Sequence, residues 1–273
     1  MKAKECVAVA TMLALGLGDS ATEVAAAPQI INQCQTLSEP GAYVLGKNLA
    51  VSGSGRGGFD CLLLGDDFIT VDLNGFTITG SGGKGSGIKL SNDFGGAGRG
   101  FEIRSGTIVN FARGIDLRVL GGSPGQNRLE RMRIEGNSDL GVVMTGNAIV
   151  KDSIFARNGI CPILAGCPPR TTNGDGLKVG SNSVVTGNTS TGNAGHGMAV
   201  GGGTVIGNTA TGNGGSGLEV GGGSTVVNNT ADGNAVGLSI GCPTSIIGNT
   251  AINNSTNLLQ QGAGCNLVDN IAP

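Results

Sequence analysis

The chain contains very few aromatic side chains. Only 3% of its 273 residues are aromatic, with a single tyrosine, Tyr43, and no tryptophan. Proteins that hold sugars by stacking them on exposed rings need such residues, so strong binding of that kind is not expected. The 53 glycines are suited instead to tight corners, in a thin structure filled by valine, isoleucine, leucine and alanine.

Charge is also scarce and nearly balanced. Charged residues make up 13% of the chain, and the formal net charge is −2. No basic run and no interleaving of aromatic with basic residues is present, so the sequence predicts no nucleic-acid partner. No apolar stretch is long enough to span a membrane. A strongly anionic polysaccharide would be attracted only if the basic side chains gathered on one face.

Asparagine recurs at a nearly constant interval in the second half of the chain. One row has steps of 20 or 21 residues and a second row follows five residues later: Asn188, Asn208, Asn229, Asn249 and Asn270, then Asn193, Asn213, Asn234 and Asn254. A fixed period near 20 residues is typical of a solenoid, in which each repeat is one turn stacked on its neighbours.

Each repeat has the composition of short strands and not of helices. An apolar pair such as Val205-Ile206 and an alternating segment such as residues 217–220 are separated by Gly and Asn, which predicts three short strands per turn. Stacked turns place equivalent residues about 4.8 Å apart, so asparagines at one corner can hydrogen-bond to each other as a structural ladder. Leucine-rich repeats need more leucine, and calcium-binding nonapeptide repeats need a GGxGxD string that is absent. We therefore predict an all-β, right-handed parallel β-helix of roughly nine coils.

The same period continues upstream with interruptions. A glycine that opens one strand recurs with steps of 20 to 35 residues: Gly87, Gly114, Gly141, Gly176, Gly197, Gly217 and Gly237. We expect an N-terminal cap and first coils over residues 34–80, coils with inserted loops over 81–182, and regular coils with a C-terminal cap over 183–273. Insertions in solenoids gather on one face, which is often the binding face.

The chain resembles the right-handed parallel β-helix repeat proteins of the pectin-lyase-like superfamily. The resemblance runs from about residue 34 to the end and is carried by the segment DFITVDLNGFTITG at residues 67–80 and by the Gly-Asn repeats. It implies the fold but little chemistry, because the family includes lyases, hydrolases, epimerases, phage adhesins and proteins of unknown role.

The N-terminus and the cysteines predict export. Lys2 and Lys4 precede an apolar stretch at residues 6–17, and small residues at 24–26 offer a cleavage site, so residues 1–26 are predicted to be a signal peptide and residues 27–273 the mature domain. Removal of the leader leaves six cysteines, an even number that favours disulfides in an exported chain. Of the 15 pairings available, we favour Cys34–Cys61, Cys161–Cys167 and Cys242–Cys265, in a secreted or periplasmic protein.

Charged residues fall into two columns beside the recurrent glycines. The residue two positions after each glycine is expected to point outward, and the residue before each glycine lies where a turn meets the strand. The two columns are Lys89, Asp116, Val143, Lys178, Ala199, Glu219 and Ser239, then Ser86, Arg113, Leu140, Asp175, His196, Ser216 and Val236. We expect the charged members to share one sheet, which in the resembled family is the floor of the polysaccharide cleft.

Two short strings suggest chemistry by resemblance. Residues 173–179 look like a loosened form of the polygalacturonase segment N-T-D-G-x-x-[IV], and residues 195–197 match that family's G-H-G. The resemblance implies that Asp175 is an acid supported by His196, but the Asp-Asp coil and R-x-K string of those enzymes are absent. A hydrolase needs two carboxylates, and Glu219 is the other one available.

A lyase or epimerase needs a base and a neutralising cation. Lys178 or His196 are candidates for the base and Arg113 for the cation, with Asp116 and Lys89 as further substrate-binding candidates. No cluster of acidic residues marks a calcium site and no other metal site or cofactor is predicted, although calcium is left open.

The sequence thus predicts an exported β-helix protein that engages extracellular polysaccharide through its first parallel sheet. Two alternatives stay open. One is a non-catalytic surface, adhesin-like or scaffold protein, and the other is a lyase, epimerase or hydrolase acting on uronic-acid polymers. The oligomeric state is not indicated.

Overall fold

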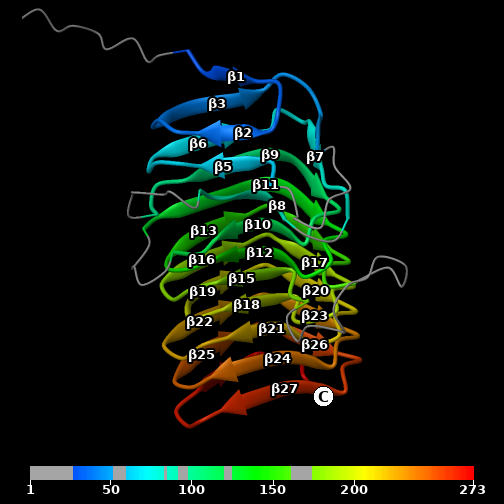
Figure 1. Ribbon diagram of the computed structural model, residues 1–273. Helices are drawn as coiled ribbons and strands as arrows, with labels where there is room; N and C mark the ends of the chain where they lie inside the picture. Colours follow the sequence, from blue (N-terminus) through cyan, green and yellow to red (C-terminus); the bar gives the residue numbers. More distant parts are fainter. Residues whose placement is uncertain (1–26, 52–59, 83–84, 92–97, 120–124, 161–173) are drawn as a thin grey trace, which may run out of the picture.

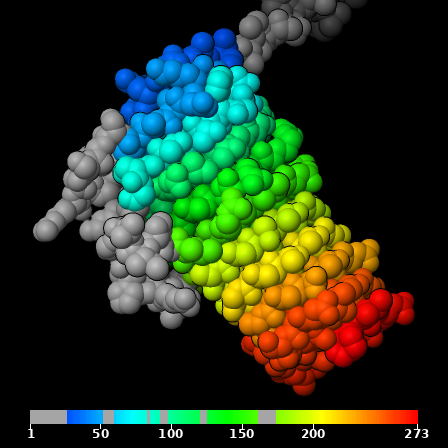
Figure 2. Space-filling model, turned by 90° about the vertical axis from the view of Figure 1, so that its right-hand side faces the viewer, coloured from blue at the N-terminus to red at the C-terminus, as the bar shows by residue number. Residues whose placement is uncertain are grey.

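A computed structural model shows a solenoid of short parallel strands stacked along one axis (Figure 1). The structure describes residues 27–51, 60–82, 85–91, 98–119, 125–160 and 174–273. The coils appear in Figure 2 as successive rows from the blue N-terminal end to the red C-terminal end. In the described part of the chain, no helix is long and apolar enough to cross a membrane. The predicted signal peptide and most of the predicted inserted loops lie outside the described residues.

The coils are built from three short strands each, as the sequence predicts, and these strands form two parallel sheets. The first sheet has ten strands, one from each coil. Its strands, in spatial order, are β2 (Gln35–Leu37), β5 (Leu62–Leu64), β8 (Ser86–Leu90), β10 (Arg113–Leu117), β12 (Leu140–Met144), β15 (Leu177–Val179), β18 (Met198–Val200), β21 (Ser216–Val220), β24 (Val236–Gly241) and β27 (Thr256–Gln261).

The second sheet has eighteen strands and follows the other two sides of each coil. One side is formed by β1 (Gln29–Ile31), β3 (Gly41–Leu45), β6 (Ile69–Asp72), β13 (Ala148–Lys151), β16 (Ser183–Thr186), β19 (Gly203–Ile206), β22 (Ser224–Val227), β25 (Thr244–Ile247) and β28 (Asn266–Val268). The other side is formed by β4 (Leu49–Ala50), β7 (Thr77–Thr79), β14 (Ile154–Ala156), β17 (Thr189–Thr191), β20 (Thr209–Thr211), β23 (Thr230–Asp232) and β26 (Thr250–Ile252). Two long strands, β9 (Glu102–Val109) and β11 (Asn127–Glu135), pair with both sides and join them into one sheet.

The interior is a column of apolar side chains with one layer per coil. In the ten-stranded sheet, the residue after each recurrent glycine is at most 1% exposed, in the order Ile88, Ile115, Val142, Leu177, Met198, Leu218 and Leu238. Parallel pairing places these residues directly above one another. The predicted inward direction of this column is therefore confirmed, and the alternate residues face outward.

The asparagines form two continuous ladders inside the corners. Asn188, Asn208, Asn229 and Asn249 each donate from Nδ2 to the Oδ1 of the next asparagine at 2.9 to 3.0 Å, ending at Asn270. The second ladder runs through Asn193, Asn213, Asn234 and Asn254 in the same way. These side chains are almost fully buried until the last coil, and their remaining donors bind backbone carbonyls. The predicted structural role is thus observed in both rows.

The recurrent glycine is required by the second ladder. A Cβ atom on Gly197 would lie 2.8 Å from the Nδ2 atom of Asn213 and 2.5 Å from the carbonyl oxygen of Gly217. Gly217 is confined in the same way by Asn234 and Gly237, at 2.7 and 2.9 Å. Any side chain here would displace either the ladder or the next strand, so close packing, and not an unusual φ angle, requires glycine.

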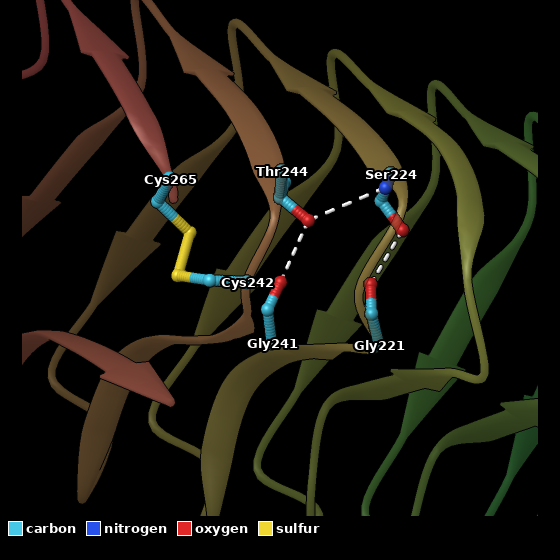
Figure 3. Close-up of a disulfide and its surroundings, with 6 residues drawn as sticks. All are labelled: Gly221, Ser224, Gly241, Cys242, Thr244 and Cys265. Carbon is cyan, nitrogen blue, oxygen red and sulfur yellow. Dashed lines mark hydrogen bonds between the residues drawn. A yellow bond between two sulfur atoms is a disulfide. The ribbon is translucent and has the colours of Figure 1, made fainter. Parts of the chain in front are cut away.

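A third corner is stabilised by the hydroxyl groups of serine and threonine, and at the last coil a disulfide takes their place (Figure 3). Ser224 Oγ donates to the carbonyl of Gly221, and Thr244 Oγ1 donates to the carbonyl of Gly241 at 2.7 Å. Thr244 Oγ1 also accepts the amide hydrogen of Ser224, at 3.3 Å. The register of β25 with β28 places Cys265 next in this column, where it is bonded to Cys242.

The structure contains two of the three favoured disulfides. Cys34 is bonded to Cys61 and Cys242 to Cys265, across sequence separations of 27 and 23 residues. Each bond therefore links a coil to the next one. Cys161 and Cys167 lie outside the described residues.

Candidate functional site

A groove of about 340 Å³ lies on the outer face of the ten-stranded sheet. It crosses β15, β18, β21, β24 and β27, so its long direction follows the solenoid axis. Four charged or titratable residues line the part of the groove from β15 to β21, namely Asp175, Lys178, His196 and Glu219. Ala199 lies between Lys178 and Glu219, and the uncharged side chains of Ser239 and Gln261 line the rest, together with glycines at the strand ends. The structure thus brings together the four residues that the sequence singled out as catalytic candidates.

His196 is the centre of a hydrogen-bonded chain across three coils. Its backbone N–H donates to Asp175 Oδ1 at 2.8 Å, and its Nδ1 atom accepts the amide hydrogen of Ser216 at 2.9 Å. Its Nε2 atom lies 3.0 Å from Glu219 Oε2. Because Nδ1 is an acceptor, the proton of the neutral ring is on Nε2 and is donated to the Glu219 carboxylate.

The Asp175 carboxyl is held in a buried position at the end of this chain. Asp175 is 3% exposed, and this burial raises the pKa of its carboxyl group above the ordinary value. The hydrogen bond from the His196 amide and the charge of Lys178 act in the opposite direction. The neighbouring Gly195 is required by this packing, since a Cβ atom there would lie 2.5 Å from Asp175 Oδ1. The G-H-G string is therefore partly a packing feature of the corner around Asp175.

Lys178 is the exposed cation of the groove. It is the central residue of β15 and lies between the buried side chains of Leu177 and Val179. It has no salt bridge to any other described residue, and its charge acts on Asp175 only at longer range. Its ammonium group is thus available to a ligand.

The three predicted substrate-binding residues lie on the same sheet but are engaged in ion pairs. Arg113 contacts Asp116 at 3.1 Å and Asp139 at 2.9 Å, and Lys89 contacts Asp60 at 2.9 Å. Arg118 also contacts Asp116, at 2.6 Å. Burial acts to raise the pKa of Asp116, but hydrogen bonds and charge from Arg118 and Arg113 hold it below its ordinary value.

The register separates these ion pairs from the groove. Asp116 on β10 pairs with Val143 on β12, and Val143 pairs with Lys178 on β15. All five residues of β12 are buried, so an apolar strand lies between the two charged groups. Two interstrand spacings, about 10 Å, separate Asp116 from Lys178. The predicted columns are in register, but they form two charged groups and not one continuous site.

Comparison with known proteins agrees with this architecture. The chain matches a family model described as right handed beta helix region over residues 70–270. The chain belongs to the right-handed β-helix family. The resemblance to pectin-lyase-like proteins is thereby confirmed at the level of the fold.

Three solved structures are similar to this β-helix protein. The Dettilon tailspike protein has a TM-score of 0.57 at 15% identity, with 88% of this chain and 53% of that chain covered. The mannuronan C-5 epimerase AlgE4 A-module of Azotobacter vinelandii has a TM-score of 0.46 at 17% identity, with 85% and 86% covered. Pectate lyase Pel9A has a TM-score of 0.43 at 16% identity, with 89% and 69% covered. The chain spans about half the length of the tailspike, and no curated protein sequence matches it.

The right-handed β-helix frame also contains residues that the sequence analysis missed. Gln261 lines the far end of the groove and donates from Nε2 to Ser239 Oγ at 2.8 Å, which helps explain why the outward-facing Ser239 is only 4% exposed. Asn137 and Asn158 extend the second ladder upstream of Asn193. Asn137 could have been found from the sequence, because it precedes Gly141 by four residues, as Asn193 precedes Gly197.

The donor set of the β-helix groove is suited to proton transfer and hydrogen bonding. Among the described residues, no group of three or more His, Cys, Asp or Glu side chains is placed to hold a metal ion. The lone pair of His196 Nδ1 is occupied by the Ser216 amide. A ligand would therefore meet Glu219 and Lys178 as the accessible acceptor and donor, and the buried Asp175 behind them.

Proposed function

We propose that this β-helix protein binds a polysaccharide along the groove on the outer face of its ten-stranded sheet. The observation that carries the proposal is the convergence of Asp175, Lys178, His196 and Glu219 in one groove. The groove crosses five strands, which corresponds to about 19 Å at about 4.8 Å per strand spacing. An elongated, open groove with a few convergent polar groups suits a linear polymer of hydroxylated units.

The hydrogen-bonding groups of the groove match the hydroxyl groups of a sugar. Lys178 donates, the Glu219 carboxylate accepts, and the Gln261 amide does both. No tryptophan is present anywhere in the chain, so recognition relies on these polar contacts and not on ring stacking.

We also propose that the protein acts outside the cytoplasm, secreted or in the periplasm. Cys34–Cys61 and Cys242–Cys265 are bonded, and disulfides persist in oxidising compartments. Residues 1–26 would then be the signal peptide that directs export, and residues 27–273 would be the mature β-helix domain.

Affinity electrophoresis in native gels that contain one polysaccharide each tests the binding proposal. We expect at least one polymer to retard the wild-type protein, and Lys178→Met to weaken that retardation about five- to tenfold through loss of the cationic donor. Thr225→Ala is the matched control, because Thr225 is exposed on β22 of the other sheet. Equal retardation of wild type and Lys178→Met would place the binding surface elsewhere.

A catalytic role is a second candidate, favoured by the raised pKa of Asp175 beside the His196–Glu219 pair. A raised pKa favours the protonated form of a carboxyl group, which is the form that a general acid needs to donate a proton to a leaving oxygen. We expect an enzyme to release reducing or unsaturated ends from the bound polymer, and Asp175→Asn to abolish this release with folding intact. A binder or scaffold would release neither.

A further inference from the structure

The distribution of positive charge along the groove constrains the polymer that it holds. After Lys178 the chain contains no lysine or arginine up to Pro273. Four of the five strands that the groove crosses, β18, β21, β24 and β27, lie in this cation-free part. Among the described residues, a ligand along the groove therefore meets one lysine or arginine, Lys178, at one end.

Acidic groups accompany that single cation. Asp175 and Glu219 line the groove together with Lys178. Glu219 is two strands from Lys178, across Ala199, and its side chain is 45% exposed. A polymer with a carboxylate on every unit would place several negative charges beside these groups, with one ammonium group to offset them. The polymer carboxylates and these acidic side chains would repel each other, and this repulsion disfavours binding of a polyanion.

The neighbouring cations of the same sheet do not supply the missing charge. Lys89, Arg113 and Arg118 are each within 3.1 Å of an aspartate oxygen, and the buried strand β12 lies between Arg113 and the groove. A polyanion would have to displace Asp60, Asp116 or Asp139 from these pairs. In the described residues, the outer face of the ten-stranded sheet thus offers no row of available cations.

The rest of the groove is lined by small or neutral groups. Ala199 lies between Lys178 and Glu219, and beyond Glu219 the groove is lined by Ser239 and Gln261, with glycines at the strand ends. Hydroxyl and amide groups pair with sugar hydroxyls without a charge on the ligand. This end of the groove is chemically matched to uncharged sugar units.

We infer that the polymer bound in this groove is a neutral glycan, or one with isolated charges, and not a polyuronate. The inference rests on the proposed function, and it departs from the uronic-acid polymers expected from the family resemblance. A single acidic substituent would fit at Lys178, with neutral units extending toward Gln261.

The test uses native gels with neutral polymers (galactomannan, xyloglucan, arabinan and mixed-linkage glucan) and with two polyuronates (polygalacturonate and alginate). Gln261→Lys adds a cation to the neutral end of the groove, and Gln261 is exposed, so folding should be retained. Gln260→Lys is the matched control, because Gln260 is also exposed on β27 but does not line the groove. Far-ultraviolet circular dichroism of each variant checks the fold.

We expect wild type to be retarded strongly by a neutral polymer and at least about tenfold more weakly by either polyuronate. Gln261→Lys should increase retardation by polygalacturonate about fivefold, the gain typical of one exposed ion pair, and Gln260→Lys should not. Stronger retardation of wild type by a polyuronate, weakened by Lys178→Met, would overturn the inference and support the proposed function. If neither the neutral polymers nor the polyuronates retard the wild-type protein, both the inference and the proposed function are refuted.

Discussion

The Asn208→Ala substitution tests whether the asparagine ladders hold the coils together. The Asn208 side chain takes part in five hydrogen bonds. Oδ1 accepts from the backbone N–H and the Nδ2 of Asn188, and Nδ2 donates to Asn229 Oδ1 and to the carbonyls of Val185 and Ile206. All of these bonds are lost when the side chain is cut back to alanine.

The expected fall in the free energy of unfolding depends on which hydrogen-bonding groups lose their partner. The backbone N–H of Asn188 has no other partner among these bonds and becomes an unsatisfied buried donor, which costs about 1–3 kcal/mol. Asn188 Nδ2 keeps its bonds to the carbonyls of Val150 and Thr186, and Asn229 Oδ1 keeps the backbone N–H of Asn208. Together with the lost bonds to Val185 and Asn229, we expect the free energy of unfolding to fall by about 3–5 kcal/mol.

Urea unfolding followed by far-ultraviolet circular dichroism measures this change. Tyr43 lies in β3 near the N-terminal end and the chain has no tryptophan, so fluorescence would not report on the region. Thr209→Ala is the matched control, because Thr209 is the next residue, points outward and is exposed, and should change stability by less than about 0.5 kcal/mol. If Asn208→Ala costs no more than Thr209→Ala, the ladder is not what stabilises the stack.

Three further outcomes are expected from the same unfolding assay. Gly217→Ala should lower the free energy of unfolding by about 1–3 kcal/mol through contact with Asn234. The double variant with Asn234→Ala should lose less than the sum of the two single losses. Strictly additive losses would contradict the packing argument. Cys265→Ser should lower stability by about 3 kcal/mol, as for a loop of 23 residues, whereas an unchanged midpoint under oxidising conditions would contradict a role for this disulfide. Burial raises the pKa of Asp175, so its favourable contribution is present below the unfolded pKa and is lost as pH rises through the folded pKa. Asp175→Asn should therefore be at least as stable as wild type near neutral pH and show a flatter pH dependence above the ordinary aspartate pKa of about 3.9; a parallel pH profile would contradict this.

The repeat made the fold predictable from the sequence. The interval of the asparagines gives the length of a coil, and the residue after each recurrent glycine gives the inward side of the ten-stranded sheet. Both follow from local spacing, because equivalent residues in a solenoid lie above one another. The same spacing favoured Cys242–Cys265, which are 23 residues apart, and in the structure Cys34–Cys61 also links adjacent coils.

The details of the site depended on contacts that spacing does not encode. The columns placed Arg113 and Asp116 on the same sheet as Lys178, but their pairing with Asp139 and Arg118 depends on side-chain reach. The interposed strand β12 separates them from the groove because its outward residue is an apolar valine. Likewise, the orientation of His196 is set by the amide of Ser216, and backbone donors have no signature in the sequence.

His196 is the only histidine in the chain, so its ring gives a single, assignable nuclear magnetic resonance signal. Titration with the polysaccharide that retards the protein in native gels, monitored at the Cε1–H signal of His196, tests directly whether the groove is the binding surface. We expect the signal to shift in a saturable way and the shift to be weakened by Lys178→Met. Binding of the polymer with an unchanged His196 signal would contradict the account.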